Sequence, residues 1–396
     1  EEHDISYKQE DNIRYQARDL AIVRAQIDKA SIILSSATPS LETQNNINKK
    51  KYMHVFLSSQ FSGLELPPIE LIDLQQHKLD KDKWISNKIY AELKNCLIKK
   101  EQALLFLNRR GYSPLSLCIE CGYRYQCEQC TSWLVMHHVK KRLLCHHCGS
   151  IYPIEPNCPK CQSEDSIKLI GPGVERLEEE LKLLFPDNII GIMSSDNANT
   201  PRKIKTIIND FKNKKTDILV ATQIMAKGYH FPNLSFVGVI DADTGLLGGD
   251  MRAIERTYNL LQQVSGRAGR SNQMGRVFIQ TYFPKQPVIQ SLQKRDRQTF
   301  VQQSLQDRKE FLIPPFGFMT ALIISGASKA KTEMYASSLS RSQQLQQETN
   351  ILGPVEAPIF LLRGQYRFRL LIKGNSRKKL NHYTRILLKK CPPPPT

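Results

Sequence analysis

The chain has 396 residues, of which 40% are hydrophobic, and its 56 lysines and arginines against 38 acidic residues give a formal charge of +18. At about 150 residues per domain, this length predicts two or three domains. No apolar run approaches the roughly 18 to 20 residues that cross a bilayer and no secretory signal opens the chain, so the sequence predicts a soluble protein. The positive charge favours nucleic acid as a partner over a merely solvated basic surface.

The first elements belong to a short unit that opens on EEHD (residues 1–4). Residues 31–34 (SIIL) predict a buried strand that runs into SATPS (residues 36–40). The polar, lysine-rich stretch 45–51 predicts the exit from this unit. Residues 65–74 (ELPPIELIDL) then read as a proline-marked connector.

Helices and strands alternate over the next two hundred residues. The periodicity predicts a helix over 84–100 and a strand over 103–107, and after a cysteine-rich block it predicts a strand at 168–171 (KLIG). The elements expected after that are a helix from 174, a strand at 188–193, a helix from 201, strands at 217–222 and 236–243, a helix over 254–264 and a strand at 277–283. This alternation predicts an α/β fold with a parallel sheet covered on both faces, and the cysteine block is expected inside its first crossover.

The pattern changes after Phe283. Residues 284–311 are helical and polar, FLIPPFGF (311–318) is a proline hinge, and MTALIISG and FRLLIKG read as strands of a small α+β domain. The domains expected are 1–50, the connector 51–83, the α/β domain 84–114 with 166–284, the insert 115–165, and a carboxyl-terminal domain 285–396.

The cysteine block indicates metal. Eight of the ten cysteines form four C-x-x-C pairs, which are Cys118 and Cys121, Cys127 and Cys130, Cys145 and Cys148, and Cys158 and Cys161. Two such pairs supply the four corners of a tetrahedral zinc site, so eight thiolates predict two closed, structural zinc sites that together form a ribbon. Redox dithiols are the alternative for any one pair.

QVSGRAGR (residues 263–270) has the form Q-x-x-G-R-x-G-R at the end of an amphipathic helix. Its two arginines are the fixed, always charged groups that a γ-phosphate needs as negative charge develops during transfer. A plain basic loop is the alternative. Upstream, Thr222, Gln223, Lys227 and Gly228 follow a buried strand, at the carboxyl edge where open α/β sheets bind ligands.

These motifs stand in the order of superfamily 2 helicases: an acidic box, then SAT, then the strand-end motif, then Q-x-x-G-R-x-G-R. In detail the chain resembles the PriA family of bacterial primosomal replication-restart helicases over almost its whole length. The segments that carry the resemblance are EEHD, SYKQEDNIRYQARDLA, SATPSLET, FLNRRGY, the eight-cysteine block, GPGVERLEEEL, TQIMAKGYHFP and QVSGRAGR.

The resemblance implies RecA-like lobes and roles for the motif residues. Domain 1–50 would end the first helicase lobe, and the α/β domain would be the second lobe. Glu1, Glu2 and His3 would belong to the acidic box, with Glu1 as general base, and Arg267 and Arg270 would reach the nucleotide. The residues implied in ATP binding and coupling are Ser36, Ala37, Thr38, Thr222, Gln223, Lys227, Gly228, Gln263 and Gly266.

The family further implies how the chain meets DNA and metal. The family motif would place Tyr7, Lys8, Arg14, Tyr15 and Arg18 in an aromatic-rich loop on unpaired bases, although RYQARDLAIVRAQ taken without the neighbouring motifs favours a surface helix. Cys118, Cys121, Cys158 and Cys161 would share one zinc and the inner four the other. The ending GPVEAPIFLLRGQYRFRLLIKG resembles the family's carboxyl-terminal domain, which implies branched and single-stranded DNA, single-strand-binding protein and primosome loaders as partners, in the bacterial cytoplasm at the nucleoid.

The resemblance also implies an ATP-dependent 3′-to-5′ DNA helicase that uses Mg²⁺ and initiates primosome assembly at stalled forks. Two features depart from the family: Val174 in GPGVE, and Ser194 and Ser195 in IMSSDNANT. No G-x-x-x-x-G-K-[ST] loop occurs in the sequence, so this chain alone is expected not to hydrolyse ATP. The alternatives are a non-catalytic zinc-ribbon scaffold on DNA and another superfamily 2 DNA translocase.

Overall fold

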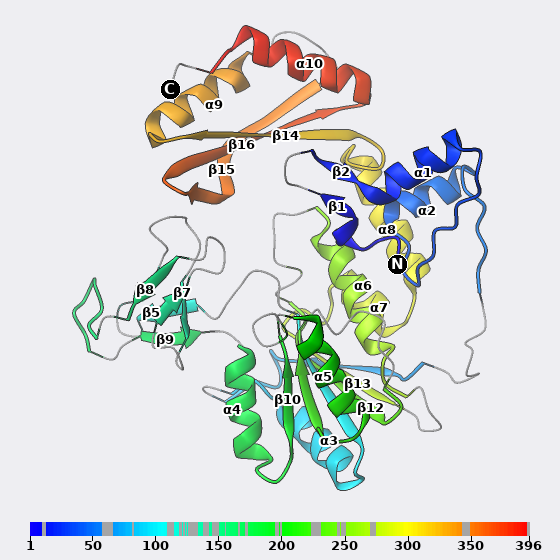
Figure 1. Ribbon diagram of the computed structural model, residues 1–396, viewed down its shortest axis with the longest axis vertical. Coiled ribbons are helices and arrows are strands. Elements are labelled where there is room, and N and C mark those ends of the chain that lie inside the picture. The colour runs from blue at the N-terminus through cyan, green and yellow to red at the C-terminus, as the bar shows by residue number, and fades with distance from the viewer. Residues whose placement is uncertain are drawn as a thin grey trace. The chain divides into compact units, whose positions relative to one another are not determined.

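In the computed structural model the chain forms two compact units, residues 1–58 with 298–318 (the first unit) and residues 59–297 with 319–396 (the second unit). The structure describes all residues except 10–12, 58–65, 81–82, 109–114, 119–120, 122, 124, 126–133, 138–141, 145–149, 155, 165–166, 171–172, 195–197, 199, 223–230, 244–245, 247–250, 270–274, 343–348 and 394–396. Figure 1 shows the elements in chain order. Among the residues that the structure describes, no helix is long and apolar enough to span a membrane.

The first unit is built from short elements. A 3₁₀ turn η1 (Ile5–Tyr7) leads into an antiparallel hairpin of β1 (Lys8–Gln9) and β2 (Tyr15–Gln16), with Lys8 opposite Gln16. Helix α1 (Ala17–Ile27) buries none of its residues, whereas α2 (Leu41–Asn48) buries Leu41, Thr43 and Asn45. Helix α8 (Arg297–Glu310) joins this unit from far along the chain.

The prediction of a buried strand at residues 31–34 is wrong. The structure places no strand there, and Ile33 is 90% exposed. An apolar run becomes a strand only when a neighbouring backbone accepts its hydrogen bonds. The described part of the first unit offers this segment no such neighbour.

A six-stranded sheet forms the centre of the second unit. Its order is β10 (Ile190–Met193), β11 (Ile218–Ala221), β4 (Gln102–Leu107), β12 (Leu234–Asp241), β13 (Arg276–Thr281) and β3 (Ile69–Asp73), and every pair is parallel. The predicted parallel sheet is therefore confirmed. The stretch read as a connector supplies the edge strand β3, with Ile69 opposite Val277.

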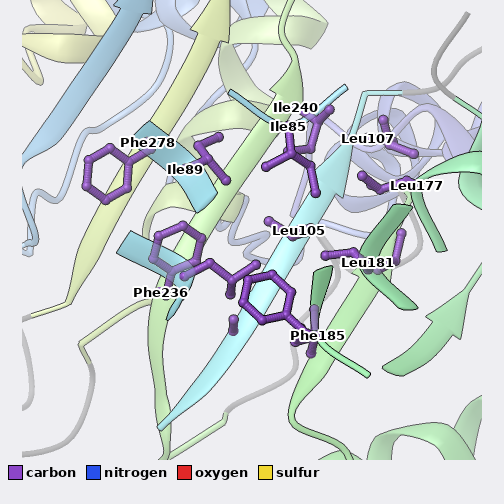
Figure 2. Close-up of a cluster of buried hydrophobic side chains, with 14 of the residues drawn as sticks. Ile85, Ile89, Leu105, Leu107, Leu177, Leu181, Phe185, Phe236, Ile240 and Phe278 are labelled. Carbon is purple, nitrogen blue, oxygen red and sulfur yellow. The ribbon is translucent and has the colours of Figure 1, made fainter. Parts of the chain in front are cut away.

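Helices cover this sheet because both faces of its strands are apolar. On one face, Leu105 and Phe236 pack with residues of α3 (Asn87–Ile98) and α4 (Val174–Leu184), as Figure 2 shows. Leu104 and Leu219 alternate with that set and are also fully buried. Helix α5 (Pro201–Lys212) packs against β10, α6 (Ala253–Ser265) against β12, and α7 (Pro287–Gln293) against β3.

The cysteine-rich insert leaves the sheet after β4 and returns at α4. Its stem is an antiparallel pair of β5 (Leu115–Cys118) and β9 (Ile167–Ile170). The strand predicted at 168–171 therefore exists, over residues 167–170, but lies in this stem, because β5 rather than a sheet strand supplies its hydrogen bonds. A second small sheet joins β6 (Val135–His137), β7 (Arg142–Leu144) and β8 (Ile151–Pro153).

The carboxyl-terminal residues form a small α+β fold, as the sequence predicts. Strands β14 (Phe318–Gly326), β16 (Gln365–Gly374) and β15 (Thr349–Leu362) make a sheet in the order β14-β16-β15. Alternate residues of β16 are buried, and α9 (Lys329–Arg341) and α10 (Arg377–Lys390) both pack on that strand.

Candidate functional site

The acidic segment at the start of the chain is hydrogen-bonded to the SATPS segment. The Glu2 amide donates to Ser35 O over 3.1 Å, which fixes the two stretches side by side. His3 Nδ1 lies 2.7 Å from Ser36 Oγ, and that hydroxyl oxygen accepts from the Thr38 amide over 2.9 Å. The structure therefore brings together the acidic box and the SAT residues that the sequence singles out.

Glu2 is the most tightly held carboxylate of this segment. Its side chain is 3% exposed, and Oε1 accepts the Ser40 amide over 2.5 Å. Oε2 accepts from the Ser40 hydroxyl over 3.2 Å and from Arg18 Nη1 over 2.8 Å. Because both of its oxygens are engaged, Glu2 orders the segment, whereas Glu1 is an exposed residue.

The electrostatics of the segment follow from burial. Burial lowers the pKa of the His3 imidazole below its usual value and outweighs the carboxylates of Glu1 and Glu2, which act to raise it. Arg18 is half-buried, and although burial opposes its charge, the hydrogen bond to Glu2 raises its pKa overall. Burial thus favours the neutral form of His3, whereas the hydrogen bond from Arg18 to Glu2 favours the charged guanidinium.

The residues expected to contact DNA divide into two groups. Tyr7, Lys8, Arg14 and Tyr15 lie on η1 and the β1–β2 hairpin and are exposed, with Tyr7 42% and Tyr15 39% accessible. Arg18 instead lies in the first turn of α1 and turns inward to Glu2 and to Ser40 Oγ, 2.8 Å away. The prediction that Arg18 contacts DNA is not supported by this position.

In the second unit, two groups of predicted nucleotide-site residues meet the sheet at opposite ends of its strands. The amide of Thr222, which is buried, donates to Met193 O at the carboxyl end of β10. Gln263, Gly266 and the buried Arg267 lie at the end of α6, where the Gly269 amide donates to Leu234 O at the amino end of β12. Gly269 has a φ of +71°, a conformation that favours glycine.

The remaining residues of these two motifs cannot be placed in the same way. Gln223, Lys227, Gly228 and Arg270 lie outside the described residues. Of the positions that depart from the family pattern, Val174 is the buried first residue of α4, Ser194 is buried, and Ser195 lies outside the described residues.

Four cysteines gather at the end of the insert's stem. The Sγ atoms of Cys118, Cys121, Cys158 and Cys161 all lie within 4.8 Å of one another. Cys118 is 3.6 Å from Cys161 and Cys121 is 3.7 Å from Cys158. Four sulfurs at about 2.3 Å from a zinc ion have edges of about 3.8 Å, so this set fits a tetrahedral zinc site.

Both halves of the cluster have the same closing backbone hydrogen bond. The Cys118 amide donates to Tyr123 O over 2.8 Å, and the Cys158 amide donates to Ser163 O over 2.9 Å, so each pair is closed by a bond from its first cysteine to the fifth residue beyond. The inner cysteines Cys127, Cys130, Cys145 and Cys148 lie outside the described residues. The described chain therefore accounts for one metal position.

Sequence reasoning missed two residues that organise these sites. Ser40 is the N-cap of α2 and binds Glu2, and only its N-cap role has a local signal, a serine just before a helical run. Ser163 Oγ lies 2.9 Å from Cys161 Sγ, and its place two residues after that cysteine was the available signal.

Two family models match the chain, one in its middle and one near its carboxyl end. Residues 157–272 match the helicase conserved C-terminal domain, and residues 309–392 match the primosomal protein N C-terminal domain. The second unit thus contains the RecA-like carboxyl-terminal lobe of a helicase. The chain is 46% identical to the replication restart protein PriA of Rickettsia conorii over 388 residues, 98% of this chain and 60% of that protein.

More distant organisms give the same match. The identity to the replication restart protein PriA of Haemophilus influenzae is 38%, over 98% of this chain and 54% of that protein. To the protein of the same name from Bacillus subtilis it is 36%, over 97% of this chain and 49% of that protein. The chain therefore spans about half to three fifths of the length of these relatives.

Proposed function

Because the chain belongs to the PriA family of replication restart proteins, we propose that it acts within an ATP-dependent 3′-to-5′ DNA helicase that recognises stalled or abandoned forks and starts primosome assembly. The observation that carries this proposal is the set of hydrogen bonds that joins Glu2 and His3 to Ser36 and Ser40. They unite two motifs of the motor in one ordered segment, which a scaffold with a decayed motor would not need.

The acidic segment supports a division of work between its residues. Glu1 is the proposed general base that orients and activates the attacking water, because it is an exposed residue while the carboxylate of Glu2 is fully engaged. ATP with Mg²⁺ supplies the phosphoryl group when bound. His3 couples the conformation of this segment to that of Ser36 and Thr38 through its hydrogen bond with Ser36 Oγ. Arg267 and Arg270 are the proposed partners of the γ-phosphate.

The cysteine cluster supports a structural metal. Cys118, Cys121, Cys158 and Cys161 would hold one zinc, and Cys127, Cys130, Cys145 and Cys148 are proposed to hold a second. With sulfur at every position, no coordination site stays open for water, so the metal contributes folding energy rather than catalysis. The ribbon they stabilise is the proposed accessory surface of the second lobe.

DNA is the proposed polyanionic partner. Tyr7 and Tyr15 are exposed rings on which unpaired bases can stack, and Lys8 and Arg14 supply charge for the backbone. Helix α10 adds Arg377, Lys378, Lys379, Lys389 and Lys390 in the carboxyl-terminal domain. From family membership we further propose single-strand-binding protein and primosome loader proteins as partners. The proposed location is the nucleoid.

The test uses the replication restart protein that contains this chain. A Glu1→Gln variant should lose most of its DNA-stimulated ATP hydrolysis, by about a hundredfold or more, while its affinity for forked DNA stays unchanged. Glu333→Gln, an exposed carboxylate on α9, is the matched control. Full activity in the Glu1→Gln variant would remove Glu1 from the mechanism.

A second measurement separates the helicase from the scaffold. This chain alone, whose sequence holds no G-x-x-x-x-G-K-[ST] loop, is proposed to bind DNA and zinc without hydrolysing ATP. If the longer protein also fails to hydrolyse ATP with forked DNA present, a non-catalytic zinc-ribbon scaffold is the better description.

A further inference from the structure

Helix α8 carries a buried arginine whose partner lies in the first unit, more than 260 residues upstream. Arg308 Nη1 lies 3.5 Å from Glu42 Oε1, and the two side chains are 5% and 19% exposed. The same Nη1 donates to Pro314 O over 3.2 Å, in the turn that follows α8. A guanidinium this deeply buried is stable only where its charge is paired, and Glu42 is the carboxylate that lies beside Nη1.

The face of α8 that bears Arg308 is the buried one. Val301 and Leu305 precede Arg308 at intervals of four and three residues, and all three are buried. The guanidinium therefore continues an apolar stripe at helical spacing. After the helix, Lys49 of the first unit lies 5.6 Å from the ring centroid of Phe316, so the turn is held to the same unit as the helix.

Glu42 stands two residues from the serine that binds Glu2. Helix α2 is only eight residues long, Ser40 is its N-cap, and Glu42 lies in its first turn. The Ser40 hydroxyl also accepts the Thr43 amide over 3.3 Å and lies 3.1 Å from Thr43 Oγ1. The first turn of α2 is thus fixed at one end by Glu2 and on its flank by Arg308.

From this geometry we propose that Arg308 is a positioning residue for the acidic segment, acting through Glu42 and the first turn of α2 on Ser40 and Glu2. A helix of two turns is marginal by itself, and its ends fray first. When Arg308 is absent, Glu42 loses its buried cation and the first turn opens. The Ser40 amide and hydroxyl then leave the Glu2 carboxylate. The importance of Glu2 for ATP hydrolysis rests on the proposed function, whereas the link from Arg308 to Ser40 does not.

Hydrogen exchange of the full chain tests the link directly. In Arg308→Met, the amides of residues 40–44 should exchange at least about tenfold faster than in the wild type, because a buried ion pair has lost one partner. Arg308→Lys keeps the cation and should restore most of the protection. Arg24→Met removes an exposed ion pair of the same unit, with side chains 84% and 51% accessible, and should change nothing.

Two results would overturn the proposal. One is faster exchange confined to α8 while the Ser40 amide keeps its protection, since Arg308 would then serve only its own helix. The other concerns Glu42→Gln, which removes the charge at the more accessible partner and remains informative if Arg308→Met does not fold. Unchanged protection of Ser40 in Glu42→Gln would exclude the route through α2.

ATP hydrolysis by the longer protein supplies an independent readout. Arg308→Met should lower kcat and leave the KM for ATP unchanged, because Glu2 acts on the reacting end of the site and not on nucleotide affinity. If no variant hydrolyses ATP, wild type included, the proposed function fails while the exchange result still decides the role of Arg308.

Discussion

The cysteine cluster and the acidic segment are both places where two stretches of chain meet, but they are held in different ways. Each half of the cysteine cluster is closed locally by one backbone hydrogen bond, from the amide of its first cysteine to the carbonyl oxygen five residues further along the chain. The acidic segment is closed by partners 16 and 38 residues away, Arg18 and Ser40. A site closed by local turns can be predicted from the spacing of its residues in the sequence. For a site closed by distant partners, the sequence shows which residue types are present but not which of them meet.

The largest expected effect is on the cysteine side of this comparison. Apparent binding free energies of structural zinc are about 10 to 16 kcal/mol, so chelation should remove the protection of residues 115–170 while the parallel sheet keeps its own. Cys158→Ser should lower the zinc content by one ion per chain, measured by metal analysis. Cys391→Ser, outside the cluster, is the control and should bind as much zinc as the wild type.

Metal analysis also addresses the second site. Two zinc ions per folded chain are expected from the eight cysteines, and a wild-type content of one would eliminate the site assigned to the inner four.

The next effect tests the distant partners. Arg18→Met leaves Glu2 buried without its cation, and breaking a buried pair costs about 3 to 5 kcal/mol in the free energy of unfolding of the first unit. This loss of free energy is measured by urea denaturation, with hydrogen exchange of residues 35–48 as the readout. Arg14→Met, at an exposed position of the hairpin, should cost less than about 0.5 kcal/mol. Equal losses in the two variants would show that the Arg18–Glu2 pair has no special weight.

A smaller effect compares two N-caps. Ser40 caps α2 and Ser86 caps α3 in the same way, since each hydroxyl accepts a hydrogen bond from the backbone amide of the third residue after it. Of the two, only Ser40 also binds Glu2. Ser86→Ala should cost about 1 kcal/mol, the usual value of a cap, and Ser40→Ala about 1 kcal/mol more, because Glu2 loses a hydrogen bond. Free energies of unfolding of the two variants measure the difference. Identical losses would mean that the hydroxyl of Ser40 serves the helix alone.

The smallest effect is a dependence on pH. Because burial lowers the pKa of His3 in the folded state, its stabilising contribution is complete above the unfolded value of about 6.5 and is lost as the pH falls through the folded value. The stability of the first unit, measured from pH 7.5 to 5, should decline with acid. His3→Asn should flatten that part of the profile, and an unchanged slope would assign the decline to other groups.

Sequence reasoning went furthest where local pattern decides the structure. ALLFL predicts a buried strand, and β4 is buried at every position, because a central parallel strand needs apolar residues on both faces. IELIDL was read as a connector because prolines precede it, yet an edge strand pairs on one side only and tolerates such neighbours. The strand predicted at KLIG is confirmed over residues 168–170, but its partner is β5, and no property of so short a segment specifies a partner.

The candidate site repeats this division. The outer four cysteines lie together, and the spacing of each pair already implied a common ligand geometry. Arg18 illustrates the opposite case, since its place among aromatic and basic residues indicated DNA, while the fold turns it to Glu2. Which of several neighbouring arginines points inward depends on the helix phase and on Ser40, and neither is local to the motif.

The stem of the insert brings the two ends of the cysteine-rich segment together. Leu115 lies opposite Ile170 in the β5–β9 ladder, so the chain enters and leaves at neighbouring positions, about 5 Å apart for paired Cα atoms. A segment whose two ends meet can be lengthened, shortened or replaced by a tight turn with little strain on its host. The parallel sheet can therefore keep its fold while lineages or engineers exchange what is carried on that stem.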